Sequence, residues 1–302
     1  MKNFLKKTLA LTGYSLKPRY KKYLWGEKTI VEREIYGYKA AMPKEHSIIF
    51  NLKHFPYYNN NLQRLAVLLA AKKDRFSIID VGANIGDTAL MFRQVIANPI
   101  LCFEGDPFYF KLLQKNTAQI SDCILFPLLL SDKVETKSII NNTSLGTTEV
   151  QTVNEGGTST TFETLDNCLA EYLNSNAIGI FKTDTDGYDI KIIKGANNLI
   201  AKHQPVIFLE YDRTLFEKNG DDGLVFFECM KNAGYSGAIF YDNYGKLICT
   251  TNLTEAKTIN SLHSYIKNSA GNFEFFDIML FSAKDETLFQ QFYESESAFF
   301  ER

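Results

Sequence analysis

The chain is poor in the residues from which disulfide frameworks and histidine sites are built. Its five cysteines are odd in number and scattered, no C-x-x-C pair occurs, and there are only four histidines among 302 residues. This predicts reduced, packed thiols in a cytoplasmic protein. No apolar run reaches the roughly 18 residues that a membrane span needs. The net charge of −2 gives no reason to expect nucleic acid as a partner.

Acidic residues are missing from the first 26 residues, which carry seven lysines or arginines. Apolar residues are interleaved with these charges, but the apolar part is too short for a signal peptide. One interpretation is a peripheral contact with the inner face of an anionic membrane. The other is a solvated arm that packs on the catalytic domain. We therefore expect a basic arm and a small accessory region over 1–54, and a catalytic domain over 55–302.

Residues 78–88 (IIDVGANIGDT) predict a buried strand, a glycine turn and the start of a helix. Gly82 and Gly86 bracket a turn that must pass close to a ligand, where a Cβ would obstruct the backbone. The helix that starts at Asp87 and Thr88 points its first N–H groups toward that ligand. Together these elements are typical of the nucleotide-binding corner of a doubly wound α/β sheet.

The residues in this turn favour S-adenosylmethionine over a dinucleotide. Asp80 replaces the first glycine of the dinucleotide pattern G-x-G-x-x-G, and Asn84 stands at its middle position. A carboxylate at the strand tip would repel a pyrophosphate, but it accepts hydrogen bonds from an ammonium group. Glu104 ends an apolar run 22 residues after Gly82, which is a suitable position for binding both ribose hydroxyls.

Three stretches of the chain resemble the FkbM-type S-adenosylmethionine-dependent methyltransferases. They are residues 79–86, residues 103–107, and the segment from 164 to 210 that contains KTDTDGYD. The family has glutamate where Asp186 and Asp189 stand, so the charge is kept. The resemblance covers about residues 55 to 212. It implies O-methylation of a sugar or another hydroxyl-bearing metabolite, with a small molecule or a glycan as acceptor.

Strand and helix patterns alternate along the chain, which predicts a mostly parallel sheet with right-handed crossovers. Strands are expected at 77–82, 100–105, 124–130, 178–184, 205–211, 237–241, 246–250 and 274–281, and helices at 86–95, 107–118, 162–173, 187–201 and 221–233. Residues 27–54 indicate a small β meander, and a polar stretch over 141–161 interrupts the alternation. The expected fold is a doubly wound, seven-stranded Rossmann-like methyltransferase sheet with an N-terminal β/helical extension.

Candidate cofactor-binding residues gather at the carboxyl ends of the first three core strands. They are Asp80, Gly82, Ala83, Asn84, Gly86, Asp87, Thr88, Glu104, Gly105, Asp106, Ser131 and Asp132. The segment of Ser131 and Asp132 follows the third strand, from which it would reach the adenine edge. A helix or turn cap is an equally good interpretation of Asp132.

Candidate catalytic residues follow the fourth and fifth core strands. Asp184 lies at the tip of the fourth strand, beside the expected position of the reactive methyl group. It would act as general base for a hydroxyl group, with Asp186 and Glu210 in support. The alternative is that Asp184, Asp186 and Glu210 hold Mg²⁺ or Mn²⁺. Asp186 could also be the N-cap of the helix that follows, and Lys182 is expected to pair with Asp184 because both point to one side of the strand.

Two other classes of protein remain open. Asp184-Thr185-Asp186 is a D-x-D sequence, as in a glycosyltransferase that binds a metal and a nucleotide sugar; a non-catalytic nucleotide-binding module is the second alternative. His46, His54, His203 and His263 are isolated, so a surface or packing role is expected for each. The aromatic and amide-rich loop over 54–61 suits either a sugar ring or a flap over the cofactor, or is an ordinary capped loop.

Overall fold

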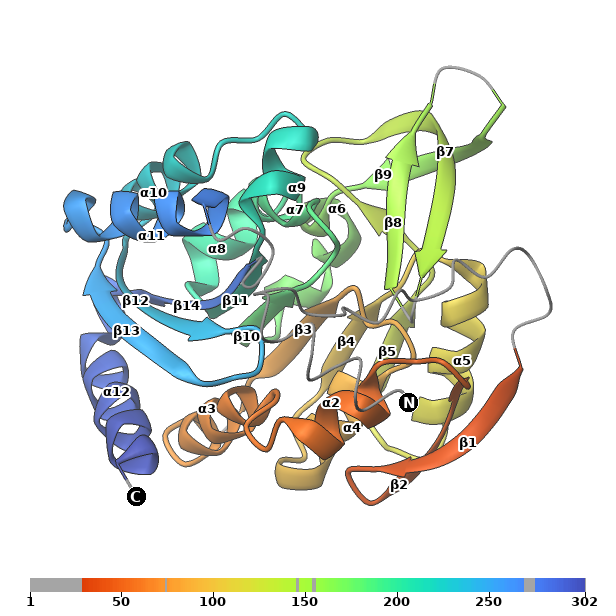
Figure 1. Ribbon diagram of the computed structural model, residues 1–302, viewed down its shortest axis with the longest axis horizontal. Helices are drawn as coiled ribbons and strands as arrows, with labels where there is room; N and C mark the ends of the chain where they lie inside the picture. The colour runs from red at the N-terminus through yellow and green to blue at the C-terminus, as the bar shows by residue number, and fades with distance from the viewer. Residues whose placement is uncertain (1–28, 74, 145–146, 154–155, 269–274, 302) are drawn as a thin grey trace, which may run out of the picture.

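One large mixed sheet forms the centre of the protein (Figure 1). The computed structural model describes residues 29–73, 75–144, 147–153, 156–268 and 275–301. In these ranges the sheet has eight strands, in the spatial order β13 (Leu247–Asn252), β12 (Tyr235–Asp242), β14 (Phe276–Ser282), β11 (Val206–Tyr211), β10 (Ile178–Thr183), β3 (Ser77–Val81), β4 (Ile100–Phe103) and β5 (Cys123–Phe126). The strands from β11 to β5 run parallel, while β14 is antiparallel to both its neighbours.

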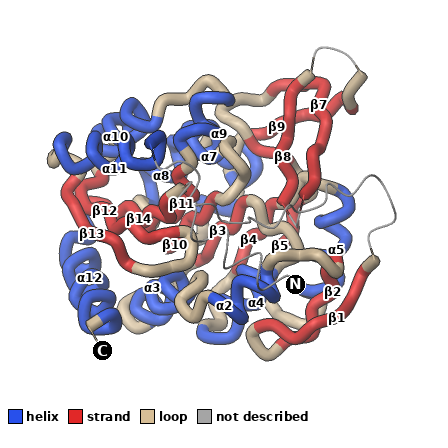
Figure 2. Tube along the Cα trace, in the orientation of Figure 1, coloured by secondary structure: helices blue, strands red, loops and turns tan. Residues whose placement is uncertain are grey.

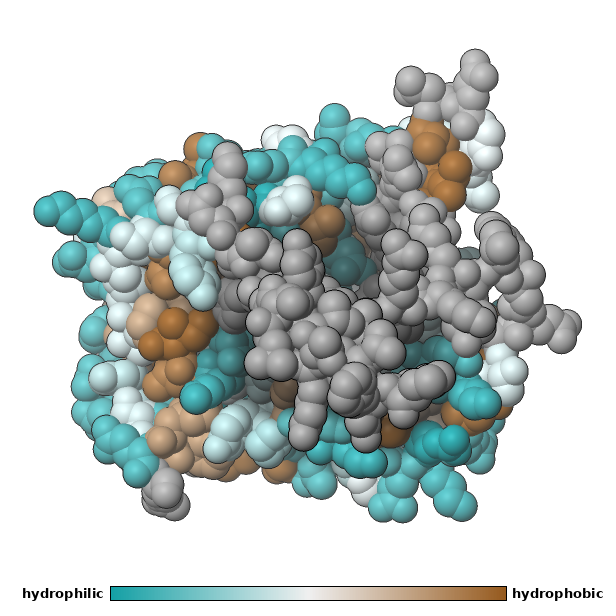
Figure 3. All heavy atoms as spheres, in the orientation of Figure 1, coloured by the Kyte–Doolittle hydropathy of each residue, from teal (hydrophilic) through white to brown (hydrophobic). Residues whose placement is uncertain are grey.

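This arrangement confirms the doubly wound, mostly parallel sheet, but one strand exceeds the predicted seven. The additional strand is β13, which pairs antiparallel with β12 at the edge of the sheet. Figure 3 shows a hydrophobic patch over β13, and Ile248 on this strand is 43% exposed. All eight strands of this sheet were predicted from the sequence, so only the predicted number of strands in the sheet, seven, was wrong.

Helices cover both faces of the sheet (Figure 2). The layer on one face consists of α3 (Asn60–Ala70), α4 (Asp87–Val95), α5 (Pro107–Thr117) and α12 (Glu286–Phe300). The layer on the other face consists of α6 (Leu165–Leu169), α7 (Asp189–Lys194), α8 (Asn197–His203), α9 (Arg213–Lys218), α10 (Gly223–Asn232) and α11 (Ala256–Asn268). Side chains alternate along a strand, so Ile78 packs against the first layer and Ile79 against the second. This explains the continuous apolar run that precedes the glycine turn.

A second sheet stands beside the carboxyl end of β5 and contains most of the polar stretch over 141–161. Its strands, in spatial order, are β6 (Leu129–Leu130), β9 (Thr158–Glu163), β7 (Glu135–Ser144) and β8 (Thr147–Thr152). The polar stretch over 141–161 thus interrupts the alternation of strands and helices as predicted, but it does so with strands that the sequence did not reveal. Threonine-rich segments favour strands because of their β-branched side chains, even where few large apolar residues mark them.

The helical layers differ from the predictions at two places. The helix expected over 187–201 is divided into α7 and α8 at Gly195, the C-cap of α7, where a Cβ would collide with the carbonyl oxygen of Ser131. The helix expected over 162–173 shrinks to α6 and a short 3₁₀ turn (Tyr172–Asn174), since β9 extends to Glu163. A second 3₁₀ turn (Ala283–Asp285) leads into α12.

The N-terminal extension consists of a hairpin and a helix, β1 (Ile30–Ile35), β2 (Tyr38–Pro43) and α2 (Ile48–His54). The β meander expected over 27–54 is thus replaced in its last part by a helix, whose Ile48 is buried against the hairpin. Residues 1–26, for which a membrane contact was predicted, lie outside the described residues. In the described part of the chain, no helix is long and apolar enough to cross a bilayer.

The extension is joined to α5 by two side chains at the end of that helix. Asn116 accepts a hydrogen bond from the backbone N–H of Ala41 (2.7 Å) and donates to its carbonyl oxygen (2.9 Å). Gln119, just beyond α5, donates to the carbonyl oxygen of Lys39 (2.8 Å). The hairpin therefore adjoins the helix through the outer edge of β2 as well as through its apolar face.

Candidate functional site

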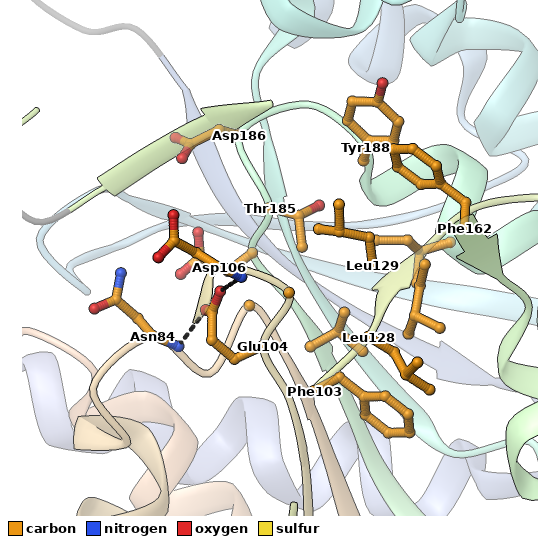
Figure 4. A pocket seen from close by; sticks show the side chains of 16 residues that line it. Asn84, Phe103, Glu104, Asp106, Leu128, Leu129, Phe162, Thr185, Asp186 and Tyr188 are labelled. Carbon is orange, nitrogen blue, oxygen red and sulfur yellow. Dashed lines mark hydrogen bonds between the residues drawn. The ribbon is translucent and has the colours of Figure 1, made fainter. Parts of the chain in front are cut away.

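A cleft of about 650 Å³, open to solvent, lies at the carboxyl ends of β3, β4 and β10 (Figure 4). Polar side chains of Asn84, Glu104, Asp106 and Asp186 stand on one side of the view, and apolar ones on the other. Of the predicted site residues, the lining includes Gly82, Asn84, Glu104, Gly105, Asp106, Asp184 and Asp186. The position is that of a ligand site in a doubly wound sheet.

The glycine turn after β3 forms the floor of this cleft. Gly82 and Gly86 have φ angles of +77° and +84°, in the left-handed region that favours glycine. A Cβ on Gly82 would collide with the carbonyl oxygen of Asp184, and one on Gly86 would lie 2.8 Å from a side-chain carbon of Leu113. The expected close approach therefore exists, but the neighbour is the protein's own chain. The other predicted turn residues are not part of the cleft lining; they are Asp80, Ala83, Asp87 and Thr88.

Glu104 faces the cleft with both carboxyl oxygens already engaged by the backbone. Its Oε2 accepts from the N–H of Asn84 (2.9 Å) and its Oε1 from the N–H of Asp106 (2.7 Å), as Figure 4 shows. Burial raises the pKa of Glu104 to about 7, although these two N–H groups lower it. Each oxygen has a second lone pair, so the carboxylate can still accept hydrogen bonds from two hydroxyl groups.

A buried ammonium group links the ends of two strands. The Nζ of Lys182 lies 3.1 Å from Oδ1 of Asp80 and 3.4 Å from Oδ2 of Asp184. The predicted pair of Lys182 with Asp184 is confirmed, and Asp80 joins it. Burial lowers the pKa of Lys182, but the two carboxylates more than reverse this, so the net shift is upward.

Asp80 and Asp184 differ in exposure although they share this ammonium group. The Asp80 side chain is fully buried, whereas that of Asp184 is 45% exposed at the cleft. Burial raises the pKa of Asp80 to about 6, opposed by Lys182. Its Oδ2 has no hydrogen-bond partner within the described residues. A buried acceptor of this kind suits an ammonium donor, as predicted for the amino-acid end of S-adenosylmethionine.

The turn after β10 is organised by Asp189. Its carboxylate accepts from the hydroxyl of Thr183 (2.7 Å) and from the N–H groups of Thr185 (3.1 Å) and Gly187 (3.3 Å). Burial raises the pKa of Asp189 to about 6. Asp186 is not the helix cap, because α7 starts at Asp189 with Tyr188 as its N-cap; instead Asp186 lines the cleft with a φ of +50°.

Glu210 lies one strand further along, beside Asp277. The two residues are paired in the register of β11 and β14, and burial raises the pKa of each, as does the nearby charge of Asp184. Glu210 is not part of the cleft lining. Among the residues that the structure describes, no three His, Cys, Asp or Glu side chains lie close enough together to hold a metal ion. The structure therefore does not support the predicted metal site at Asp184, Asp186 and Glu210.

Ser131 and Asp132 lie outside the cleft lining. Ser131 is buried against Gly195 and donates its hydroxyl hydrogen to Asp132 (3.0 Å). The preceding residues, 128–130, line the cleft instead, together with Phe103 and Phe162. These apolar residues were not among the predicted site residues; their position directly before Ser131 was the one available signal. They form an apolar slot that fits an adenine ring.

His46 is a second residue that the sequence did not reveal. Its Nε2 lies 3.2 Å from the side-chain Oδ1 of Asn84, in the glycine turn. In the sequence it is an isolated histidine, and no spacing links it to the turn 38 residues later. Only the folding of the hairpin onto α4 and α5 brings it there.

The fold and the cleft together define a class of protein, the S-adenosylmethionine-dependent methyltransferases with a Rossmann-like sheet. The acceptors present fit this cofactor, with Glu104 at the cleft for its ribose hydroxyls and Oδ2 of Asp80, buried behind the lining without a partner among the described residues, for its ammonium group; the apolar slot fits its adenine. Residues 80–236, more than half of the chain, match the Methyltransferase FkbM domain, and the chain belongs to that family. S-adenosylmethionine is the cofactor of this family. The assignment favours a methyltransferase over the glycosyltransferase alternative.

Several solved structures have similar folds. Methyltransferase FkbM from Methylobacillus flagellatus is 15% identical, with a TM-score of 0.36 over 55% of this chain and 40% of its own. Precorrin-6y C5,15-methyltransferase from Geobacter metallireducens is 12% identical, with a TM-score of 0.37; the match covers 73% of this chain and 87% of that one. TYW2 of M. jannaschii in complex with AdoMet is 9% identical, with a TM-score of 0.40; the match covers 86% of this chain and 90% of that one. No curated protein matches the chain.

Proposed function

We propose that the protein transfers a methyl group to a hydroxyl oxygen of a sugar or glycan. The observation that carries this proposal is the position of Asp184. Its carboxylate is half exposed in the cleft lining, while the buried Lys182 holds it from behind. A hydroxyl group is a poor nucleophile until its proton is drawn off, and a fixed, partly exposed carboxylate performs that task.

When bound, S-adenosylmethionine supplies the methyl group. The acceptor oxygen would take this methyl group as the methyl–sulfur bond breaks and S-adenosylhomocysteine leaves, and the hydroxyl proton would pass to a carboxylate oxygen of Asp184. Lys182 keeps Asp184 in place through the 3.4 Å contact.

Aromatic side chains at the same edge of the sheet support a sugar acceptor. The rings of Phe55 and Tyr244 stack with centroids 3.6 Å apart. Tyr244 lies in the turn after β12, whose last residue pairs with Phe276 at the edge where β11 ends. Tyr244 and Phe50 are 39% and 52% exposed. Exposed aromatic faces suit the apolar face of a sugar ring.

The experiment that tests this proposal is methyl transfer from labelled S-adenosylmethionine to cell-surface glycan fractions and free sugars. We expect Asp184→Asn to lower turnover by roughly a hundredfold or more, because the shape is kept and the base is lost. Affinity for S-adenosylhomocysteine should stay within twofold. The matched control is Asp122→Asn, an exposed position before β5 at the other edge of the sheet, which should retain full turnover.

Two outcomes would contradict the assignment. Normal turnover in Asp184→Asn would remove this carboxylate from the mechanism. Label found on nitrogen or carbon of the product, and not on oxygen, would overturn O-methylation. If a chelator abolished activity and magnesium restored it, a metal ion that binds the acceptor hydroxyl would take the role proposed for Asp184 as base.

The location and partners of the protein belong to the same proposal. We place it in the cytoplasm, where five free thiols remain reduced, and expect no nucleic-acid partner. A membrane contact through residues 1–26 would bring it to glycan precursors at the inner face. Removal of these residues should then lower binding to anionic vesicles at low salt and leave methyl transfer intact. Equal vesicle binding of both forms would refute the contact.

A further inference from the structure

The side-chain hydroxyl of Thr185 is a polar group of the cleft that the argument above leaves without a role. The residue lines the cleft directly after Asp184. Its Oγ1 is shielded from solvent and has no hydrogen-bond partner among the residues that the structure describes. A buried hydroxyl group without a partner costs free energy. At the wall of a ligand site, a partner on the ligand removes that cost.

Contacts with two turns set the orientation of this side chain. Asp189 accepts a hydrogen bond from the backbone N–H of Thr185 at 3.1 Å, which holds the turn after β10. The methyl carbon Cγ2 of Thr185 lies toward the glycine turn, since a Cβ built on Gly82 would be 3.2 Å from it. A β-branched side chain has few rotamers, so this placement of the methyl group also fixes the hydroxyl group. Figure 4 shows Thr185 between the polar side chains and the apolar slot, with its oxygen on the side of Leu129.

The apolar slot leaves a hydrogen-bonding task to this hydroxyl group. The five side chains that form it are those of residues 128–130, Phe103 and Phe162. They can enclose a flat base or stack against it, but none of the five can form a hydrogen bond with it. Ligand sites orient a bound molecule through a few placed polar groups among apolar ones. Because a hydroxyl both donates and accepts, it can bind a ring nitrogen or the amino group of adenine.

We propose that Thr185 is a specificity-determining residue of the cofactor site, whose side-chain hydroxyl forms a hydrogen bond with the adenine base of S-adenosylmethionine. Glu104 then binds the ribose from the polar side, and Thr185 binds the base in the slot. The turn that carries Asp184 therefore contacts the cofactor as well. This inference requires only the cofactor and does not depend on the hydroxyl acceptor proposed above.

The test is calorimetric titration with S-adenosylhomocysteine, which needs no acceptor and no turnover. Thr185→Val replaces the hydroxyl by a methyl group of similar size and should weaken binding by about three- to tenfold, as for one lost hydrogen bond. Adenosine, which lacks the amino-acid end, should lose affinity by the same factor. Thr185→Ser should recover most of the affinity, since it keeps the hydroxyl. The loss should add to that of Glu104→Ala, because the two residues bind different groups of the ligand.

Thermal unfolding without ligand gives an independent readout. Because Thr185→Val removes a buried hydroxyl that has no partner among the described residues, the free variant should melt at the wild-type temperature or above it. A residue with only a structural role would not combine this result with weaker binding. The control is Thr158→Val, an exposed position on β9 outside the cleft lining, which should bind as wild type does.

Several outcomes would overturn the inference. Wild-type affinity in Thr185→Val would remove the hydrogen bond, and a lower melting temperature of the free variant would show that the hydroxyl already has a partner. A loss for S-adenosylhomocysteine but not for adenosine would place the hydroxyl at the amino-acid end. A loss that does not add to that of Glu104→Ala would place it at the ribose. Should the valine variant fail to fold, Thr185→Ser and Thr185→Ala differ only by the hydroxyl group and give the same comparison.

Discussion

The cofactor end and the acceptor end of the cleft are held by different kinds of interaction. At the cofactor end, the contacts are made mainly by backbone groups. Two N–H groups bind Glu104, and the turn of Gly82 packs against the backbone of Asp184. At the acceptor end, Asp184 depends on the buried ammonium group of Lys182, which it shares with Asp80 of β3. The first end therefore depends on backbone shape, and the second on a balance of charge.

The largest test of this contrast is removal of the shared ammonium group. Lys182→Met should destabilise folding by about 3–5 kcal/mol, because it leaves Asp80 buried and unpaired. The measurement is chemical denaturation at neutral pH, with Lys111→Met on the exposed side of α5 as control. Adding Asp80→Asn should recover much of the loss. A single variant as stable as wild type would show that charge balance does not hold this end.

The next effect concerns backbone shape at the cofactor end. Gly82→Ala should destabilise by about 2–3 kcal/mol, because strain at positive φ adds to the collision with Asp184. Gly37 is a matched control, since its φ of +81° is similar but its Cβ would meet nothing within 4 Å. Gly37→Ala should cost about 1 kcal/mol from the φ strain alone. Equal losses in the two variants would mean that close approach is unimportant.

A smaller loss is expected when the cofactor end loses its carboxylate. Glu104→Ala should weaken S-adenosylhomocysteine binding by about 1–3 kcal/mol, since a charged acceptor of hydroxyl groups is removed. NADH should bind neither the wild type nor the variant tightly. Glu228→Ala, an exposed position on α10, serves as control. Retained affinity in Glu104→Ala would place the ribose elsewhere.

The smallest effect is a pH dependence that belongs to the cofactor end. The pKa of Glu104 is raised to about 7, so its carboxylate form becomes dominant as the pH rises through 7. A ligand that binds the carboxylate should then gain up to about tenfold in affinity from pH 6 to pH 8. Calorimetry across this range provides the check, and Glu104→Gln should flatten the profile. A profile that falls with rising pH would contradict the assignment.

The sequence predicted the cofactor end better than the acceptor end, because the first is local. A strand, a glycine turn and a helix follow one another within eleven residues, and each has a recognisable pattern. Asp184 and its pairing with Lys182 were also predicted from the alternation of one strand. Glu210 was expected in the cleft, but residue patterns do not say how far apart two strand ends lie across a twisted sheet.

Long-range contacts account for what the sequence could not show. His46 reaches Asn84 only because an apolar hairpin packs on α4 and α5, and no local pattern encodes that packing. The second sheet was hidden for a different reason. Its threonine-rich strands lack the apolar alternation by which strands are recognised, so a polar stretch was the natural interpretation.

The side chains of Asn116 and Gln119 have a consequence for the solubility of the folded protein. The outer edge of a two-stranded hairpin normally leaves backbone N–H and C=O groups that can recruit a strand from another molecule. Here Asn116 engages both groups of Ala41, and Gln119 engages the carbonyl of Lys39, the alternate residue on the same edge. The end of a helix thus takes the place of a missing strand, and the hairpin is closed to edge-to-edge association at these positions.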